Sequence, residues 1–249
     1  MKTYKINGHS LSYNNEIAVY DPVYDPYNVF DLPSNTLRVK FKSGYTPTMG
    51  DTLTLVDAMQ NIWDIYISDN NWAGKFYGNS NLLEVMGANT TNVTYMGALF
   101  AECTALSAVN LFDTSNVSGT GSMFSYCVSL SSVPPFDLSN DRDVSNMFSV
   151  CTSLQSVPLY DTSNVNNMRT MFFNCSSLTY IPLFDTTNVS SMERTFTNCY
   201  NVEKGALAMY SQVSSHDSVF SFHNKTFSSC GINTVIGSYE LSQIPDDWK

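Results

Sequence analysis

Apolar positions recur along most of the chain with a constant period of 24 residues. Cysteine recurs at Cys103, Cys127, Cys151, Cys175 and Cys199. Phenylalanine stands three residues before each of them, at Phe100, Phe124, Phe148, Phe172 and Phe196. A period of this length is typical of units that stack, because each unit buries its apolar face only against its neighbours. One period earlier lies Phe76, so we expect the array to begin near residue 75, with Asn79 in the cysteine position.

Each unit predicts the same succession of local structures. Leu, Ile and Leu in the run 178–183 place apolar side chains on the inner face of a short strand. After the strand of each unit comes a turn sequence such as Asp161–Asn164. Its residue types, Asp, Thr, Ser and Asn, favour turns and helix N-caps. Val165, Met168 and Met171–Phe172 then recur with a spacing of three and four, which predicts a short helix or helical turn.

The pattern divides the chain into three predicted parts. Residues 1–74 form a small β-rich N-terminal domain for capping or attachment, residues 75–238 form a solenoid of about six coils, and residues 239–249 form a C-terminal cap. In the N-terminal part, strand-like runs occupy residues 36–42, 52–56 and 62–67. A five-residue connection between the last two predicts a hairpin.

Composition restricts the partners. The chain has 249 residues, with 12 basic and 22 acidic side chains and a net charge of -10. Nucleic acid is not expected as a partner, because binding phosphates needs clustered Lys and Arg. No apolar run approaches the roughly 20 residues that a membrane helix needs, so we expect no membrane insertion.

Catalytic chemistry is not indicated. We find no paired carboxylates with a nearby base, no phosphate-binding loop and no catalytic triad, so the sequence predicts a protein that is not an enzyme and has no cofactor. The grouping of His216, Asp217, His223 and Cys230 matches no zinc spacing, so no metal site is expected. The recurring cysteines are expected to be reduced, buried and inert, because they lie among core positions.

Two further rows of residues are candidates for function. Asp113, Asp137, Asp161 and Asp185 should lie about 5 Å apart in neighbouring coils. Their mutual repulsion needs compensation, either by capping of the following turn or by a cation such as calcium.

The second row is aromatic. Phe112, Phe136, Tyr160 and Phe184 each follow the Leu or Pro position that we place inward. Strand alternation then directs them outward, as a stripe on the sheet face that binds a ligand. The alternatives are a self-packed ladder of rings or a stripe covered by a neighbouring subunit.

The repeat resembles the BspA-type leucine-rich repeats, in the branch with the unit M-F-x-x-C-x-x-L-x-x-I-P-L-F-D-T-S-N-V-x-x-M. The copy from Met171 to Met192 is close to it, and the resemblance covers about residues 75–236. It implies a leucine-rich-repeat solenoid, with a parallel β-sheet on one face and short helical turns on the other. It also implies a surface protein of bacteria, their phages or some parasites, usually engaged in adhesion. The N-terminal segment and the ending QIPDDWK resemble structural proteins of gut phages.

These observations predict a non-enzymatic recognition or adhesion module on a virion or bacterial surface. It would bind a host-cell envelope glycan or protein through the sheet face. The alternative is a purely structural virion component, such as a decoration, fibre or baseplate subunit. In that case the aromatic stripe would be the interface of a homo-oligomer or a contact with other virion or surface proteins.

Overall fold

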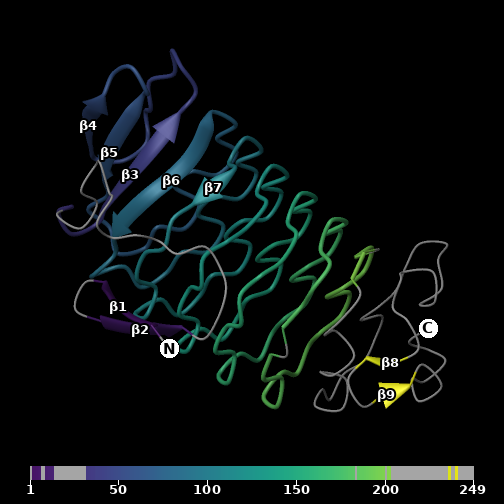
Figure 1. The fold of residues 1–249 in the computed structure, drawn as a ribbon. Coiled ribbons are helices and arrows are strands. Elements are labelled where there is room, and N and C mark those ends of the chain that lie inside the picture. Colours follow the sequence, from purple (N-terminus) through teal and green to yellow (C-terminus); the bar gives the residue numbers. More distant parts are fainter. Residues whose placement is uncertain are drawn as a thin grey trace.

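The computed structural model describes residues 2–6, 9–13, 32–182, 184–199, 201–202, 235–236 and 239–240. Its strands are β1 (Lys2–Ile6), β2 (His9–Tyr13), β3 (Thr36–Phe41), β4 (Thr52–Asp57), β5 (Ile62–Tyr66), β6 (Leu82–Asn89), β7 (Ala108–Val109), β8 (Val235–Ile236) and β9 (Tyr239–Glu240). β1 with β2, and β8 with β9, form two-stranded antiparallel sheets, and the others form a mixed five-stranded sheet in the order β4-β5-β3-β6-β7 (Figure 1).

The antiparallel part of the five-stranded sheet contains the predicted hairpin. β4 pairs with β5, β5 with β3 and β3 with β6, all antiparallel, so the three strands predicted in this part are confirmed. β3 supplies Leu37, Val39 and Phe41 to the core, as alternation requires. Arg38, between them, donates two hydrogen bonds to the Asp64 carboxylate, at 2.7 and 2.8 Å. The sheet is therefore held by packing on one face and by a bidentate ion pair on the other.

The sheet changes from antiparallel to parallel where the repeats begin. β6 pairs with β7 in parallel, and the partners Val85 and Val109 are equivalent residues of successive units. Further along, equivalent residues form isolated parallel bridges, such as Ser156 with Tyr180. Figure 1 shows the result: successive turns of chain, which we call coils, lie side by side along one direction.

Opposite the sheet, each coil forms a segment of consecutive turns, which we call the turn side. It comprises residues 72–79, 96–103, 120–127, 144–151, 168–175 and 192–199. Bonds such as Leu99 N–H to Met96 C=O close single turns within the segment. Every second N–H of the segment donates instead to a carbonyl of the next coil, as when Phe100 donates to the carbonyl of Met123 at 2.9 Å. Three or four bonds of the second kind join most neighbouring coils.

The turn side contains no helix, although the apolar spacing predicted one. No residue in the described ranges is helical. Two positions in each coil have positive φ, for example Ala98 at 53° and Glu102 at 60°, and a right-handed helix cannot pass through such residues. The predicted short helical turns are therefore replaced by left-handed kinks, which turn every second N–H towards the next coil.

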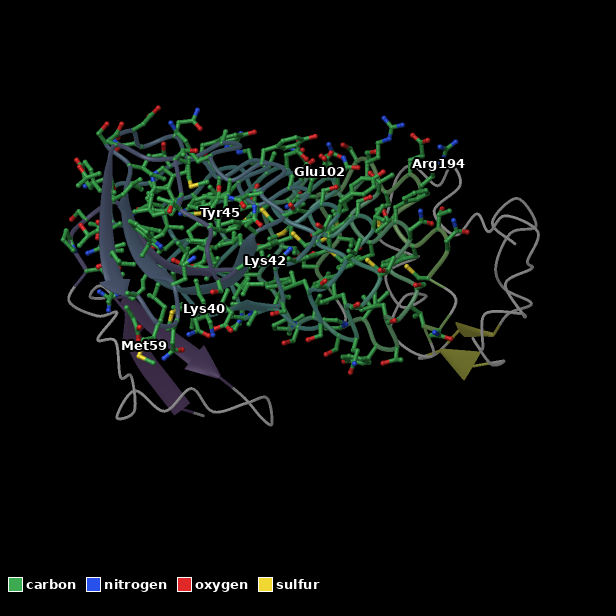
Figure 2. All side chains as sticks on the ribbon, turned by 90° about the horizontal axis from the view of Figure 1, so that it is seen from above. Lys40, Lys42, Tyr45, Met59, Glu102 and Arg194 are labelled. Atoms are coloured by element: carbon green, nitrogen blue, oxygen red, sulfur yellow. The ribbon has the colours of Figure 1, made fainter. Side chains whose placement is uncertain are left out.

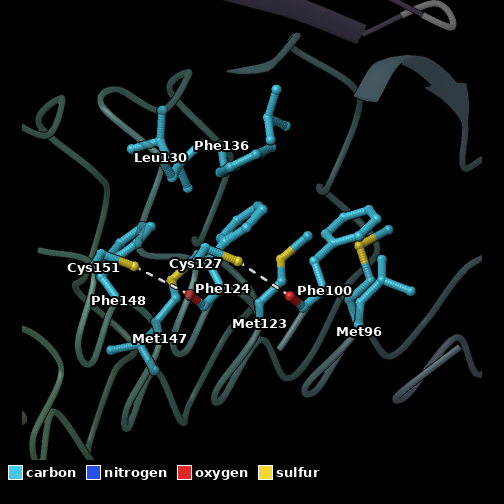
Figure 3. Packing of buried hydrophobic residues seen from close by; sticks show 14 of the residues in the cluster. Met96, Phe100, Met123, Phe124, Cys127, Leu130, Phe136, Met147, Phe148 and Cys151 are labelled. Carbon is cyan, nitrogen blue, oxygen red and sulfur yellow. Dashed lines mark hydrogen bonds between the residues drawn. The ribbon is translucent and has the colours of Figure 1, made fainter. Parts of the chain in front are cut away.

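The core is a set of rows that run through the coils. Phe100, Phe124, Phe148, Phe172 and Phe196 are buried, and neighbouring rings stack with centroids 5.6–5.9 Å apart. Cysteine, methionine and leucine rows lie beside them (Figure 3). One apolar cluster extends from Leu37 in β3 to Val202, so the N-terminal strands and the coils share a single core.

Candidate functional site

The four aromatic side chains predicted to face outward are buried. Phe112, Phe136, Tyr160 and Phe184 retain only 1, 3, 2 and 1% of their exposure. Phe112 packs against Phe136 in a tilted arrangement with centroids 5.1 Å apart, and Phe136 stacks on Phe124 at 5.8 Å. The prediction that these rings form an outer, ligand-binding stripe is therefore wrong in its orientation. They form a second aromatic row inside the core.

The error has a local cause: the strands are shorter than the alternation assumed. β7 ends at Val109, and the next buried residue is Phe112, three positions later rather than two. In the following coil the Phe136 N–H donates to the Pro134 carbonyl at 3.0 Å, which closes a tight turn. Such a turn rotates the chain, so the residue after the expected inward position points inward instead.

The side chains that do face outward on the sheet side are different. Leu159, which we placed inward, keeps 65% of its exposure, and Tyr180 keeps 49%. Tyr180 pairs with Ser156 in a parallel bridge, and Leu159 follows Ser156 by three residues, so the two apolar side chains belong to neighbouring coils. We call Leu159 and Tyr180 the sheet-side patch. Sequence reasoning missed it because Leu159 occupies a position that alternation assigns to the core.

The aspartate row caps turns. One carboxylate oxygen of each aspartate accepts the backbone N–H two residues ahead, at 2.9–3.1 Å, in Asp113, Asp137, Asp161 and Asp185. The hydroxyl of Thr187, followed by its N–H, lowers the pKa of Asp185. This is the geometry expected for turn capping. Within the described ranges, no three His, Cys, Asp or Glu side chains come close enough together to hold a metal ion.

The cysteines form a hydrogen-bonded row. The Cys151 thiol donates to the carbonyl of Phe124 in the preceding coil at 3.1 Å, as Figure 3 shows. The other four described cysteines make the same contact. All five are buried and free, so the expectation of reduced cysteines is confirmed for them; Cys230 lies outside the described residues. Burial raises the pKa of Cys103 and Cys151 to about 12, which removes the reactive thiolate at neutral pH.

One coil has a polar pair in place of two core side chains. Asp141 occupies the position of Val117 and Val165, and Thr120 occupies that of Met96 and Met168. Both are fully buried, and the Thr120 hydroxyl donates to an Asp141 carboxylate oxygen at 2.6 Å. Burial raises the pKa of Asp141, while the bonds from Thr120 and from the Asp143 N–H oppose the rise.

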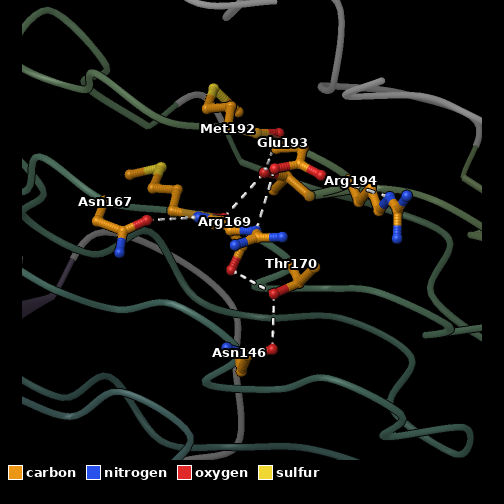
Figure 4. A network of polar contacts seen from close by, with 9 residues as sticks. Asn146, Asn167, Arg169, Thr170, Met192, Glu193 and Arg194 are labelled. Carbon is orange, nitrogen blue, oxygen red and sulfur yellow. Dashed lines mark hydrogen bonds and ion pairs between the residues drawn. The ribbon is translucent and has the colours of Figure 1, made fainter. Parts of the chain in front are cut away.

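The exposed charges form small separate groups. Glu193 contacts Arg169 at 3.2 Å and Arg194 at 3.5 Å on the turn side (Figure 4). Nearby, the Thr170 hydroxyl donates to the Asn146 side chain at 2.6 Å, which links neighbouring coils. Lys40 contacts Glu84 at 3.4 Å on the sheet; Figure 2 labels Lys40 and Arg194 towards opposite ends of the molecule. None of these groups combines a nucleophile with a base.

Two overlapping stretches, residues 63–157 and 130–232, match the family described as "Mycoplasma protein of unknown function, DUF285". Together they span well over half of the chain. The chain belongs to this family. No curated protein and no solved structure gives a significant match.

The DUF285 family is associated with BspA-like repeat proteins, as the resemblance of the 24-residue unit implies. The first matched stretch begins within β5 of the five-stranded sheet, and the second extends beyond the last described coil. In this DUF285 member, a search for membrane-spanning helices over the described residues finds none.

Proposed function

We propose that the coils form a leucine-rich-repeat solenoid of the BspA type and that the protein is a non-enzymatic recognition or adhesion module. It would act on a virion or bacterial surface and bind a cell-envelope glycan or protein through the sheet side. The sheet-side patch carries this proposal, because Leu159 and Tyr180 are large apolar side chains left exposed on a surface otherwise rich in Ser, Thr and Asn.

The proposal also agrees with how the coils are built. Most of the bonds between coils lie on the turn side, and the exposed side chains of Leu159 and Tyr180 are not part of the core rows, so these side chains are not needed for packing. A surface of this kind can vary its side chains without loss of the fold. The association of the family with BspA-like repeat proteins supports a surface role.

Binding to whole cells tests this function. The full chain, labelled with a fluorophore, is incubated with candidate host bacteria and bound protein is measured by flow cytometry. We expect the double change Leu159→Ser with Tyr180→Ser to abolish binding while thermal unfolding stays unchanged. Tyr66→Ser, at another exposed tyrosine on β5, is the matched control and should bind normally.

A structural role in a virion is the second candidate, and the edge strand β4 favours it. β4 is the outermost strand of the five-stranded sheet and exposes Leu55 and Val56, with Met59 exposed just beyond it. An uncovered edge with apolar side chains can pair with another chain. Light scattering of a purified assembly that dissociates on Leu55→Lys would favour this role over recognition.

A further inference from the structure

A cavity of about 240 Å³ opens where the loop between β3 and β4 meets the first coil. Its lining includes Tyr45 from that loop and Lys75, Tyr77, Gly78, Asn79 and Asn81 from the first coil. Figure 2 labels Tyr45 beside the first coils and Glu102 further along the array. We call this space the first-coil cavity.

Two of the residues that line the cavity, Gly78 and Asn79, depart from the repeat. Gly78 is equivalent to Glu102, Tyr126 and Val150, and a Cβ atom built on Gly78 would meet no atom within 4 Å. The missing side chain leaves open space in this coil. Asn79 stands where later coils have cysteine. In those coils, as at Cys103, the thiol donates to the carbonyl of a phenylalanine 27 residues earlier.

The polar groups of the cavity are held in place. Asn79 is buried, its side-chain N–H donates to the Tyr45 hydroxyl at 3.2 Å, and its side-chain oxygen accepts the Asn81 N–H at 3.1 Å. Asn61 fixes the loop by donating to the Tyr45 carbonyl at 2.7 Å. Lys75 is half-buried and makes no ion pair within the described ranges. The cavity therefore offers fixed hydrogen-bonding groups and one ammonium group.

An aromatic and acidic rim adjoins the cavity. Tyr77 keeps 58% of its exposure, and its hydroxyl donates to a Glu102 carboxylate oxygen at 2.5 Å. This bond raises the pKa of Tyr77. Tyr126, 49% exposed, occupies the position of Glu102 in the next coil. Tyr77, which lines the cavity, thus connects it to a carboxylate on the neighbouring coil.

We propose that the first-coil cavity binds one sugar ring of a neutral glycan. A pyranose has an apolar face that stacks on an aromatic ring such as Tyr77, and hydroxyls that both donate and accept hydrogen bonds. Glu102 accepts from such hydroxyls, and Lys75 and Asn81 donate to them. The volume is below the roughly 300–1,000 Å³ of pockets for drug-sized ligands, which suits a single ring.

The charges favour a neutral sugar over an acidic one. Glu102 and Lys75 have opposite charges, so the site itself has no excess of positive charge. The chain as a whole carries -10, which repels anionic glycans. This site rests on the proposed recognition function but lies away from the sheet-side patch, so the two can be tested separately.

Glycan binding by variants of the full chain is the test. An array of neutral bacterial and mucin-type oligosaccharides identifies the best probe, which is then titrated calorimetrically. We expect Tyr77→Ala to weaken binding at least about tenfold, equivalent to about 1.4 kcal/mol. Gly78→Asn should do the same by filling the cavity, and it should fold normally, because Asn174 and Asn198 occupy the equivalent left-handed position. Tyr66→Ala is the matched control and should bind as the unchanged chain does.

Each outcome decides a different claim. Binding that survives both cavity variants but disappears with the Leu159 and Tyr180 changes overturns the cavity site and leaves the proposed function intact. An array without any binding, together with normal attachment to cells, overturns the glycan site but not recognition. Failure to bind either glycans or cells contradicts both proposals.

Discussion

The two sides of each coil are held together by different means. On the turn side, three or four backbone hydrogen bonds join most neighbouring coils, and a cysteine thiol adds a further bond at five of the coil junctions. On the sheet side, β7 has only two residues, and the later described coils contribute the Ser156–Tyr180 bridge and single bonds such as Gln155 N–H to Ser131 C=O. Pro134 and Pro135 reduce the pairing further, because proline has no N–H to donate.

The contrast shows that most of the backbone bonds between coils lie on the turn side, which we call the spine. The sheet-side positions are constrained mainly by the inward Val, Leu and aromatic residues. Outward positions there, such as Leu159 and Tyr180, are the ones to which we assign the proposed binding. The changes below test this division of roles, beginning with the largest expected effect.

Removal of a ring from the spine should have the largest effect. Phe148 stacks on Phe124, Tyr160 and Phe172 with centroids 5.7–6.3 Å apart. We expect Phe148→Ala to lower the free energy of unfolding by about 3–5 kcal/mol, because a buried cavity remains. Leu159→Ala on the sheet side should change it by no more than about 0.5 kcal/mol. Urea unfolding followed by circular dichroism measures both, and equal losses would contradict the division.

Replacing the polar pair Thr120 and Asp141 by apolar side chains should have the next largest effect on the free energy of unfolding. The double change Thr120→Met with Asp141→Val introduces the side chains that other coils have there, and we expect a gain of about 1–4 kcal/mol. Thr120→Met alone should instead destabilise the protein, because it leaves the buried Asp141 carboxylate without its hydroxyl partner.

The gain should depend on pH. Because folding raises the pKa of Asp141, the native state holds its proton more tightly than the unfolded chain does. The unchanged protein therefore loses stability as pH rises from about 3.8 through the folded pKa. Thermal unfolding at pH 4 and pH 7 should show a larger advantage of the double variant at pH 7. An equal advantage at both values would mean that Asp141 is ionised as readily as in solution.

The cysteine row should matter less per residue. Cys151→Ala removes the donor to the Phe124 carbonyl and should cost about 1–3 kcal/mol. The thiol pKa of about 12 lies above the ordinary value of 9.0, so the native state favours the protonated thiol. Stability should therefore be constant below pH 9 and fall as pH rises towards 12. Native thiols that react rapidly with Ellman's reagent at pH 8 would contradict this account.

Replacing a β-branched residue in the left-handed conformation should have the smallest effect on stability. Val150 has a φ of 61°, which is unfavourable for a β-branched side chain, whereas Asn174 and Asn198 occupy the same position in later coils. We expect Val150→Asn to stabilise the protein by about 0.5–1 kcal/mol, since asparagine adopts this conformation more readily. Differential scanning calorimetry should detect the rise, and a lower melting temperature would show that Val150 contributes packing that outweighs the strain.

The sequence predicted the features that depend on spacing alone. The period of 24 identified the buried phenylalanine and cysteine rows, and β propensity with turn residues identified β3, β4 and β5. It could not distinguish a helix from consecutive turns on the turn side, because both bury residues three and four apart. The distinction lies in bonds such as Phe100 N–H to Met123 C=O, which join different coils.

The candidate sites were harder to predict for related reasons. Alternation failed at Phe136 because residues 131–136 form no strand and the chain makes a tight turn at Pro134. The first-coil cavity depends on Tyr45, which lies 34 residues from Asn79, and no local pattern relates the two. Gly78 was the available signal, since every later described coil has a side chain at that position.

Hydrogen exchange tests the central claim, that the turn side is the spine, most directly. Peptides from residues 96–103, 144–151 and 168–175 are compared by mass spectrometry with peptides from residues 107–114 and 155–162. We predict that the amides bonded between coils on the turn side exchange last, at the rate of global unfolding, while the sheet-side amides exchange earlier. Slower exchange on the sheet side than on the turn side would contradict the account.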